Sequence, residues 1–357
     1  MASAYAAAKN GARVILAEDK PRFGGSLLTS DVSINNQSGK EWADNIITEL
    51  KGMTNVTVKN RAQIFGYYDH NMLVMSERVT DHLPKSEEFT PKQRLWYIRA
   101  KQVVISSGSI ERPIVFGNND TPGVVLASAA KEYMKVYGVL VGKKPIVFTN
   151  NDSAYETAIE FKKNNINPIV LDSRQDSNSE IVKEAKSLGI DIKFSHVVVA
   201  AKGYKKVKSC DIAEISEDKQ NLNQIKNIEC DCICVSGFWT PTIHLASQSG
   251  GKTKFKEEID AFVPDKSKQK EVTLGSANGV FTLEETLKTS FDKGFELSKE
   301  ITNNNNSQQI PKVSEKKHSK HDKFWCVPLP KGKKYKRFLD FQNDVAVSDI
   351  ELAIRGL

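Results

Sequence analysis

The stretch that decides the fold is Arg13-Val-Ile-Leu-Ala-Glu-Asp-Lys-Pro-Arg-Phe-Gly-Gly-Ser-Leu-Leu28. Its apolar run, residues 14–17, predicts a short parallel strand that helices bury on both faces. Glu18 follows at the carboxyl end of this strand. In a dinucleotide-binding fold, a carboxylate at that place accepts hydrogen bonds from the adenosine ribose and repels a 2′-phosphate. The stretch favours NAD or FAD over NADP, although a plain strand ending in an acidic surface turn has the same pattern.

The residues before this stretch strengthen the dinucleotide interpretation. The alanine-rich segment 2–10 predicts a helix that ends at Gly11, where positive φ commonly stops a helix. Helix, glycine, strand and acid form the second half of a βαβ unit, whose first half is a strand and a glycine-rich turn. The chain opens inside the helix, so we expect a fragment or an internal start that lacks this first turn.

Three turns carry the other candidate cofactor contacts. Gly24 and Gly25 allow the backbone to approach a ligand where a side chain would collide, and Ser107 and Gly108 do the same after the apolar strand 103–105. An ordinary turn explains the second of these equally well. A third turn follows Thr273. The candidate cofactor-binding residues are Glu18, Asp19, Gly24, Gly25, Ser26, Ser107, Gly108, Gly275, Ser276 and Asn278. No catalytic or metal-binding residue is predicted.

The middle of the chain predicts a second nucleotide-type domain. Residues 144–148 have the pattern of a strand and 154–163 that of a helix, but Thr149-Asn-Asn-Asp-Ser153 stands between them where glycines would bind phosphate. Asp152 opposes phosphate charge and caps a helix well. We therefore predict a nucleotide fold that has lost its nucleotide.

Composition limits the partners. Among 357 residues the net charge is +7, with Lys and Arg concentrated in 312–323 and 331–337. A solvated linker explains these runs better than an anionic partner, and sparse aromatic residues leave nucleic acid little support.

His318 and His321, near Cys326, have metal-ligand spacing, but a solvated tail explains them better. Residues 230, 232 and 234 are cysteines that alternate along one strand, which predicts buried thiols on one face. No signal peptide or membrane span is found, so a cytoplasmic location is expected.

Several longer strings resemble one family. They are Gly24-Gly-Ser-Leu-Leu28, Ser107-Gly-Ser-Ile-Glu-Arg-Pro113, Asn119-Asp-Thr-Pro-Gly-Val124, Phe148-Thr-Asn-Asn-Asp152, Val235-Ser-Gly-Phe-Trp-Thr-Pro-Thr242, Ser247-Gln-Ser-Gly-Gly251 and Asp340-Phe-Gln-Asn-Asp344. Together they resemble the alpha subunit of heterotetrameric sarcosine oxidase along almost the whole chain. More loosely, the chain is similar to flavoprotein disulfide reductases.

The resemblance implies an α/β fold of two Rossmann-like dinucleotide-binding domains of the disulfide-reductase FAD/NAD(P) type, the second inserted in the first, with a small β-meander. The expected parts are an NAD-binding domain (1–122 plus 240–302), a second Rossmann-like domain (123–239), a flexible linker (303–337) and the start of a truncated domain (338–357). Flavin-binding relatives have Gly-Asp where this chain has Gly275-Ser276, which favours NAD over FAD in the first domain.

The implied reaction is flavin-dependent oxidative demethylation of sarcosine, a secondary amine, with peroxide formation and transfer of the one-carbon unit to tetrahydrofolate. The implied cofactors are NAD here, FMN at the interface with a partner subunit, FAD on that partner, and tetrahydrofolate on a domain absent from these residues. Beta, gamma and delta-like subunits are the implied partners, and the chain alone is expected to be inactive. Two alternatives stay open: a subunit of an opine or cyanide-forming amine dehydrogenase, and a non-catalytic scaffold.

Overall fold

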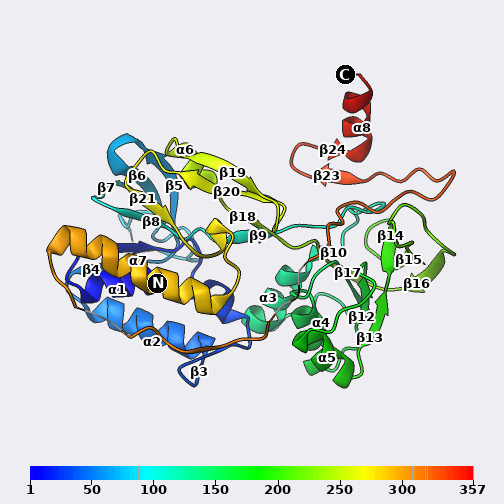
Figure 1. Ribbon diagram of the computed structural model, residues 1–357, viewed down its shortest axis with the longest axis horizontal. Coiled ribbons are helices and arrows are strands. Elements are labelled where there is room, and N and C mark those ends of the chain that lie inside the picture. The colour runs from blue at the N-terminus through cyan, green and yellow to red at the C-terminus, as the bar shows by residue number, and fades with distance from the viewer. Residues whose placement is uncertain (87, 307–308, 318, 320, 357) are drawn as a thin grey trace. The chain divides into compact units, whose positions relative to one another are not determined.

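The computed structural model describes residues 1–86, 88–306, 309–317, 319 and 321–356. It divides into two compact units (Figure 1). Unit 1 contains Met1–Ile110 and Thr240–Glu315, and unit 2 contains Glu111–Trp239 and Lys316–Leu357. Unit 1 is thus discontinuous in sequence, and the described residues of the stretch 303–337 are divided between the two units.

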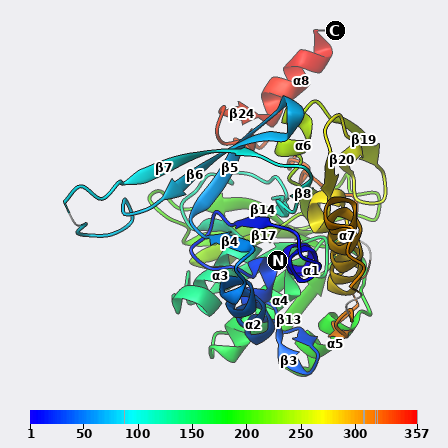
Figure 2. The same ribbon diagram turned by 90° about the vertical axis from the view of Figure 1, so that its left-hand side faces the viewer.

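Unit 1 contains two pairs of parallel strands, β1–β4 and β8–β21. Helices α1 and α2 lie beside the first pair (Figure 2). No ladder joins the two pairs within the described ranges. Its elements are α1 (Ala2–Lys9), β1 (Val14–Ala17), η1 (Gly25–Leu28), β2 (Ser33–Ile34), β3 (Gln37–Ser38), α2 (Gly39–Gly52), β4 (Val56–Lys59), β5 (Ala62–Tyr68), η2 (Asp69–Asn71), β6 (Met72–Arg78), β7 (Gln93–Arg99), β8 (Val103–Ile105), α6 (His244–Gln248), β19 (Lys252–Lys256), β20 (Ala261–Lys266), β21 (Glu271–Thr273), η3 (Gly275–Asn278), α7 (Leu283–Thr302) and β22 (Val313–Ser314).

Local sequence explains the helices of unit 1. Alanines let α1 pack closely on α7, where Gly294 leaves room for the backbone of Ser3. Helix α2 begins at a capping box, in which the Ser38 hydroxyl accepts from the Glu41 N–H and the Glu41 carboxylate accepts from the Ser38 N–H. The apolar face of α2, including Trp42, is buried. These contacts hold β1 and β4 against one helical layer.

Strand β1 has the predicted bounds but is less buried than predicted. Its Ile15 side chain is 45% exposed, so the prediction of a strand buried on both faces was wrong at this position. Along one edge β1 pairs with β4, from Val14↔Val56 to Ala17↔Lys59. In the described part of the chain no strand pairs with its other edge. Fewer neighbours therefore cover Ile15 than would cover a central strand.

The predicted meander is an antiparallel sheet of β5, β6 and β7. The turn at Asp69–Asn71 joins β5 to β6, with His70 at φ 59°. Tyr67 and Met75, on one face of this sheet, are fully buried. Within unit 1, this face of the meander packs against β8, because Tyr67 shares a hydrophobic cluster with Val103 and Ile105.

Unit 2 is organised around a five-stranded parallel sheet in the order β10-β17-β11-β12-β13. An antiparallel sheet, β14-β15-β16, is inserted in the chain between β13 and β17. The elements are β10 (Val124–Leu126), α3 (Ala127–Tyr137), β11 (Pro145–Thr149), α4 (Tyr155–Lys163), β12 (Ile169–Asp172), α5 (Glu180–Ser187), β13 (Asp191–Phe194), β14 (His196–Lys202), β15 (Ser209–Glu214), β16 (Lys226–Glu229), β17 (Cys232–Ser236), β23 (Phe338–Asp340), β24 (Val345–Ala346) and α8 (Val347–Arg355). Two short strands, β9 (Ser109–Glu111) and β18 (Trp239–Pro241), pair where the chain passes between the units.

Two sequence expectations about unit 2 need correction. Cys232 and Cys234 share a face of β17, with their sulfur atoms 3.6 Å apart, but Cys230 packs into the hydrophobic cluster on the opposite face. The strand begins only at Cys232, so the alternation does not extend back to Cys230. The apolar pattern of residues 190–200 also predicts one strand, but the structure breaks it at Ser195, whose φ is 51°, into β13 and β14. No described helix combines the length and apolarity that a membrane span requires.

Candidate functional site

Glu18 lies at the carboxyl edge of the β1–β4 pair. Its N–H donates to the carbonyl of Lys59 at 2.9 Å and its carbonyl accepts from the N–H of Ala62 at 2.8 Å, which fixes its backbone. The half-buried carboxylate accepts from the Lys20 N–H at 3.0 Å, and the amino group of Met1, at the start of α1, attracts it. A carboxylate beside a helix start at this edge is where a dinucleotide fold holds the ribose.

The Glu18 carboxyl group is a strongly perturbed acid. Burial and a hydrogen bond with the neighbouring Asp19 side chain raise the pKa of Glu18 to about 7. The Lys20 N–H and the Met1 amino group oppose this rise in pKa. Because the charged form has few donors, a ligand hydroxyl that donates to the carboxylate would favour ionisation.

In the turn after Phe23, Gly25 and Ser26 are exposed and Gly24 is half-buried. Gly24 has φ 127° and Gly25 has φ 54°, and nothing lies within 4 Å of where a Gly25 side chain would begin. The Ser26 carbonyl accepts from the Thr29 N–H at 3.1 Å, which closes the short helix η1. The backbone at Gly25 therefore has open space beside it, and a close approach of a ligand there stays a prediction.

The structure brings the second and third candidate turns together. Strands β8 and β21 are parallel, from Glu271↔Val103 to Thr273↔Ile105, so the turns that follow them lie at one edge. One is Ser107-Gly108, where Gly108 has φ 77° and open space beside it, and the other begins at Gly275, which is buried with φ 66°. The Ser107 hydroxyl donates to the Thr242 carbonyl at 2.7 Å, so this side chain fixes the turn.

The ten candidate residues thus form two groups. One is Glu18, Asp19, Gly24, Gly25 and Ser26 beyond the β1–β4 pair, and the other is Ser107, Gly108, Gly275, Ser276 and Asn278 beyond the β8–β21 pair. Helix α1, which packs on both β1 and α7, links the elements behind them. No hydrogen bond between the groups is found among the described residues.

A helix that starts just after the third candidate turn would be expected to point its N–H groups at cofactor phosphates, but in the structure an acidic side chain lies at the start of α7. The first two N–H groups of the helix, of Leu283 and Glu284, donate to the Glu315 carboxylate at 2.8 and 2.9 Å. A carboxylate is stabilised at a helix N-terminus as a phosphate is. The chain's own anion therefore occupies this place, and sequence reasoning missed it because Glu315 follows the end of the helix by 13 residues.

Sequence reasoning also missed Glu271. It lines a hollow of about 810 Å³ between the β19–β20 hairpin and η3, which also includes the candidate Asn278. Ser249 donates to Glu271 Oε1 at 3.1 Å, while Oε2 is buried without a hydrogen-bond partner in the described residues. Burial raises the pKa of this carboxyl group. The only sequence signal for Glu271 was its position just before Thr273, after which the third candidate turn begins.

In unit 2, the groups that would bind a nucleotide form hydrogen bonds with one another instead. The Asn151 and Ser153 N–H groups, which follow β11, donate to the side chains of Thr149 and Asn151 at 3.1 and 3.0 Å. Asp172, at the end of β12, accepts from Arg174 Nη2 and the Tyr155 hydroxyl, both at 2.7 Å. These groups are thus paired within unit 2, and the loss of a nucleotide from this fold stays a prediction.

Arg174 also bonds to a second buried acid. Its Nη1 lies 2.8 Å from Oδ1 of Asp152, whose side chain is fully buried. Burial alone would raise the pKa of Asp152, but Arg174 and the bonds from Ser319 hold it below its ordinary value. The ion pair thus fills the carboxyl edge of β11 and β12.

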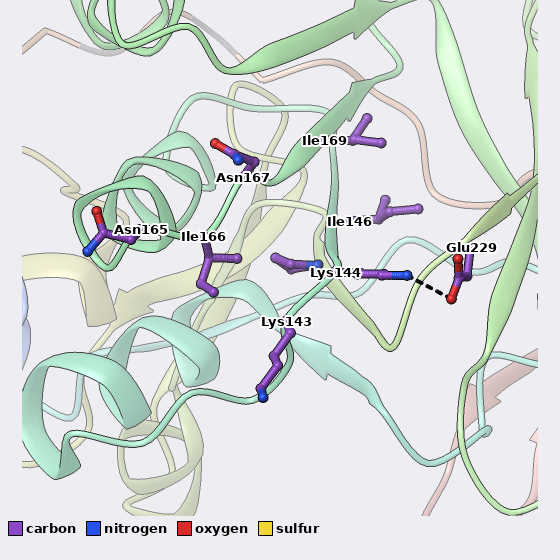
Figure 3. Close-up of a pocket in the computed structure, with 9 residues that line it drawn as sticks. Lys143, Lys144, Ile146, Asn165, Ile166, Asn167, Ile169 and Glu229 are labelled. Carbon is purple, nitrogen blue, oxygen red and sulfur yellow. Dashed lines mark ion pairs between the residues drawn. The ribbon is translucent and has the colours of Figure 1, made fainter.

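A hollow of about 390 Å³ opens at the opposite, amino edge of the same sheet (Figure 3). Lys144, just before β11, points toward Glu229 and pairs with it at 2.8 Å, and Ile169 begins β12 on the other side. Ligands of open parallel sheets bind at the carboxyl edge. This hollow therefore carries none of the predicted site.

Comparison with known proteins identifies relatives along nearly the whole chain. It is 32% identical over 358 residues to the sarcosine oxidase subunit alpha of Corynebacterium sp. (strain P-1), covering 98% of this chain and 37% of the relative. It is also 32% identical to that of Rhizobium meliloti (strain 1021), covering 99% of this chain and 35% of the relative. The predicted resemblance to these subunits is confirmed. No family model matches.

Solved structures confirm the predicted fold. Thioredoxin reductase from T. acidophilum matches with a TM-score of 0.62 at 14% identity, covering 85% of this chain and 93% of its own. L-proline dehydrogenase from P. horikoshii matches with a TM-score of 0.58 at 20% identity, covering 85% and 53%. The chain spans little more than a third of the length of its curated relatives.

Proposed function

We propose that this chain is the dinucleotide-binding part of an oxidoreductase subunit like the sarcosine oxidase alpha subunit, and that unit 1 binds NAD. The observation that carries the proposal is the half-buried Glu18 carboxylate at the carboxyl edge of β1, in a chain related to these subunits over 98% of its length. An acid at this place selects a free ribose 2′-hydroxyl over a 2′-phosphate.

The residues of unit 1 fit this ligand in three places. Glu18 would hold the ribose hydroxyls, with Asp19 beside it adding negative charge against a 2′-phosphate. Gly25 and Gly108 have open space where a side chain would stand, so a cofactor can lie along their backbone. Ser276 and Asn278 would flank the far end of the nucleotide. NAD supplies hydride-transfer chemistry when bound, and this chain's residues would bind and orient it.

The whole-protein activity we propose is flavin-dependent oxidative demethylation of sarcosine, with peroxide formation and one-carbon transfer to tetrahydrofolate. In that scheme FMN lies at the interface with a beta-like subunit, FAD lies on that subunit, and tetrahydrofolate binds a further domain of the complete protein. Gamma and delta-like subunits complete the assembly. The relatives' names and the dinucleotide fold support this assignment.

Titration calorimetry with NAD and NADP tests the cofactor assignment on the full chain at pH 8. We expect NAD to bind more tightly than NADP. Glu18→Gln should weaken NAD binding by about 1.5–3 kcal/mol, roughly tenfold or more in Kd, because the hydrogen bonds to a charged acceptor are lost. The matched control is Glu296→Gln on the exposed side of α7, which should bind as the wild type does.

Purification with the natural partners separates the alternatives. Co-purified NAD and FMN support the sarcosine oxidase assignment, and FAD together with iron would instead indicate an amine dehydrogenase. Absence of any nucleotide, combined with undetectable NAD binding by the wild type, would indicate a non-catalytic scaffold. The Glu315 carboxylate at the start of α7 is the observation that favours this last alternative.

A further inference from the structure

We propose that the carboxyl edge of the unit 2 sheet is a peptide-binding site, and that its ligand is the segment 321–327 of the same chain. The segment lies beyond the end of β11, where a dinucleotide-binding domain receives its cofactor. This inference is independent of NAD binding by unit 1, because every contact that carries it is within unit 2.

Asn150, the first residue after β11, binds the backbone of the segment. Its Nδ2 donates to the carbonyls of Asp322 at 2.8 Å and Phe324 at 3.2 Å. Its own carbonyl accepts from the Asp322 N–H at 3.0 Å. Asn150 is fully buried, and it occupies the place where a glycine-rich loop would offer N–H groups to pyrophosphate. The residue that replaces the phosphate loop thus recognises main-chain groups of a peptide.

A second contact extends the recognition along the segment. The Val115 N–H donates to the Trp325 carbonyl at 2.8 Å, and the Val327 N–H donates to the Val115 carbonyl at 2.8 Å. These two bonds form a parallel bridge between Val115 and Cys326. Val115 lies outside the named strands, so this pairing is a single main-chain bridge that fixes the position of the segment next to Cys326.

Apolar side chains of the segment fill the core of unit 2. Phe324 is 5% exposed and Val327 is 1% exposed, and both belong to the cluster that includes Phe148 of β11. Burying each such side chain stabilises the docked state by about 1.5–3 kcal/mol. The hydrogen bonds from Asn150 and Val115 fix the position of the segment. The buried side chains of Phe324 and Val327 supply much of its binding free energy.

Aromatic and cationic contacts complete the site. The His321 ring stacks on Phe238 with their centroids 4.1 Å apart and their planes 6° apart. The Arg112 guanidinium lies 4.2 Å from the centroid of the Trp325 ring. A nucleotide would have to displace all of these contacts to reach this edge, so unit 2 holds a peptide in its place.

Hydrogen exchange measured by mass spectrometry on the full chain tests the inference. Asn150→Ala removes both Nδ2 bonds, so peptides that cover 321–327 should exchange at least tenfold faster than in the wild type. Peptides from α4 and α5 should keep their wild-type rates. The control is Asn164→Ala, an exposed amide at the end of α4 that is remote from the segment and should change nothing in it. His321→Ala, which is milder, should accelerate the same peptides severalfold.

Unchanged exchange of 321–327 in both variants would overturn the proposal, as would a uniform acceleration across unit 2 in both. A photoreactive adenine dinucleotide provides an independent test on the wild type. Labelling of residues 149–153 would overturn the proposal, whereas labelling confined to unit 1, or no labelling, supports it. Failure of NAD binding by unit 1 would show as loss of unit 1 labelling and leaves the exchange result unaffected.

Discussion

Glu18→Gln should stabilise the protein above pH 7 while it weakens dinucleotide binding. In the folded chain the pKa of Glu18 is raised from 4.5 to about 7, mainly by burial. Between these two values the folded state keeps a proton that the unfolded state releases. The stability contributed by this proton is complete below about pH 4.5 and is lost as the pH rises through 7.

The size of the effect follows from the difference of about 2.5 pKa units. At about 1.36 kcal/mol per unit this corresponds to roughly 3.4 kcal/mol. The side chain is partly exposed, and solvent screening reduces the value, so we expect about 1–2 kcal/mol. A neutral glutamine avoids this cost, because it needs no ionisation at high pH.

Urea unfolding at pH 5 and pH 8.5 measures the effect. The free energy of unfolding of the wild type, relative to Glu18→Gln, should fall by about 1–2 kcal/mol from pH 5 to pH 8.5, with the Glu296→Gln control following the wild type. A difference between wild type and Glu18→Gln that is the same at both pH values would refute the reasoning.

The same carboxyl group links binding to protons. Ribose hydroxyls donate to its charged form, so NAD binding at pH 6 should release close to one proton from the wild type. Calorimetry in buffers of different ionisation enthalpy measures this release. Glu18→Gln should release none. Equal proton release from both proteins would show that Glu18 does not contact the ligand.

Three other substitutions test other parts of the structure. Arg174→Leu should destabilise the protein by about 3–5 kcal/mol in urea unfolding, because it leaves the buried Asp152 and Asp172 carboxylates without their cation; a loss below 1 kcal/mol would contradict the ion pair. Glu315→Gln should lower stability by about 0.3–1 kcal/mol at low salt and by less in 1 M salt, as expected for a charge at a helix start. Gly108→Ala should cost about 1–2 kcal/mol from its φ of 77° alone, since the space beside it is open, and a Val at that position should cost more.

Much of the fold follows from local sequence patterns. The strand at 14–17, the hairpin of β5 and β6 and the strand at 103–105 have the bounds that apolar runs and turn residues predict. The helix from Gly39 to Gly52 follows from its apolar period and its capping box. These features depend on residues a few positions apart, so the sequence displays them directly. The acidic residue after β1 and the absence of glycines after β11 are likewise local features that the sequence displays directly.

Contacts between distant residues required the tertiary structure. Nothing near Asn150 in the sequence indicates that it binds the backbone of Asp322, 172 positions away. Nor does the pattern around Leu283 show that Glu315 caps the helix. Neither is visible in a periodic pattern, because a hydrogen bond between remote segments depends on how the chain folds back on itself. The sequence alone therefore determined the elements and the dinucleotide class of the fold, and tertiary packing decided which of its ligand-binding edges remain open.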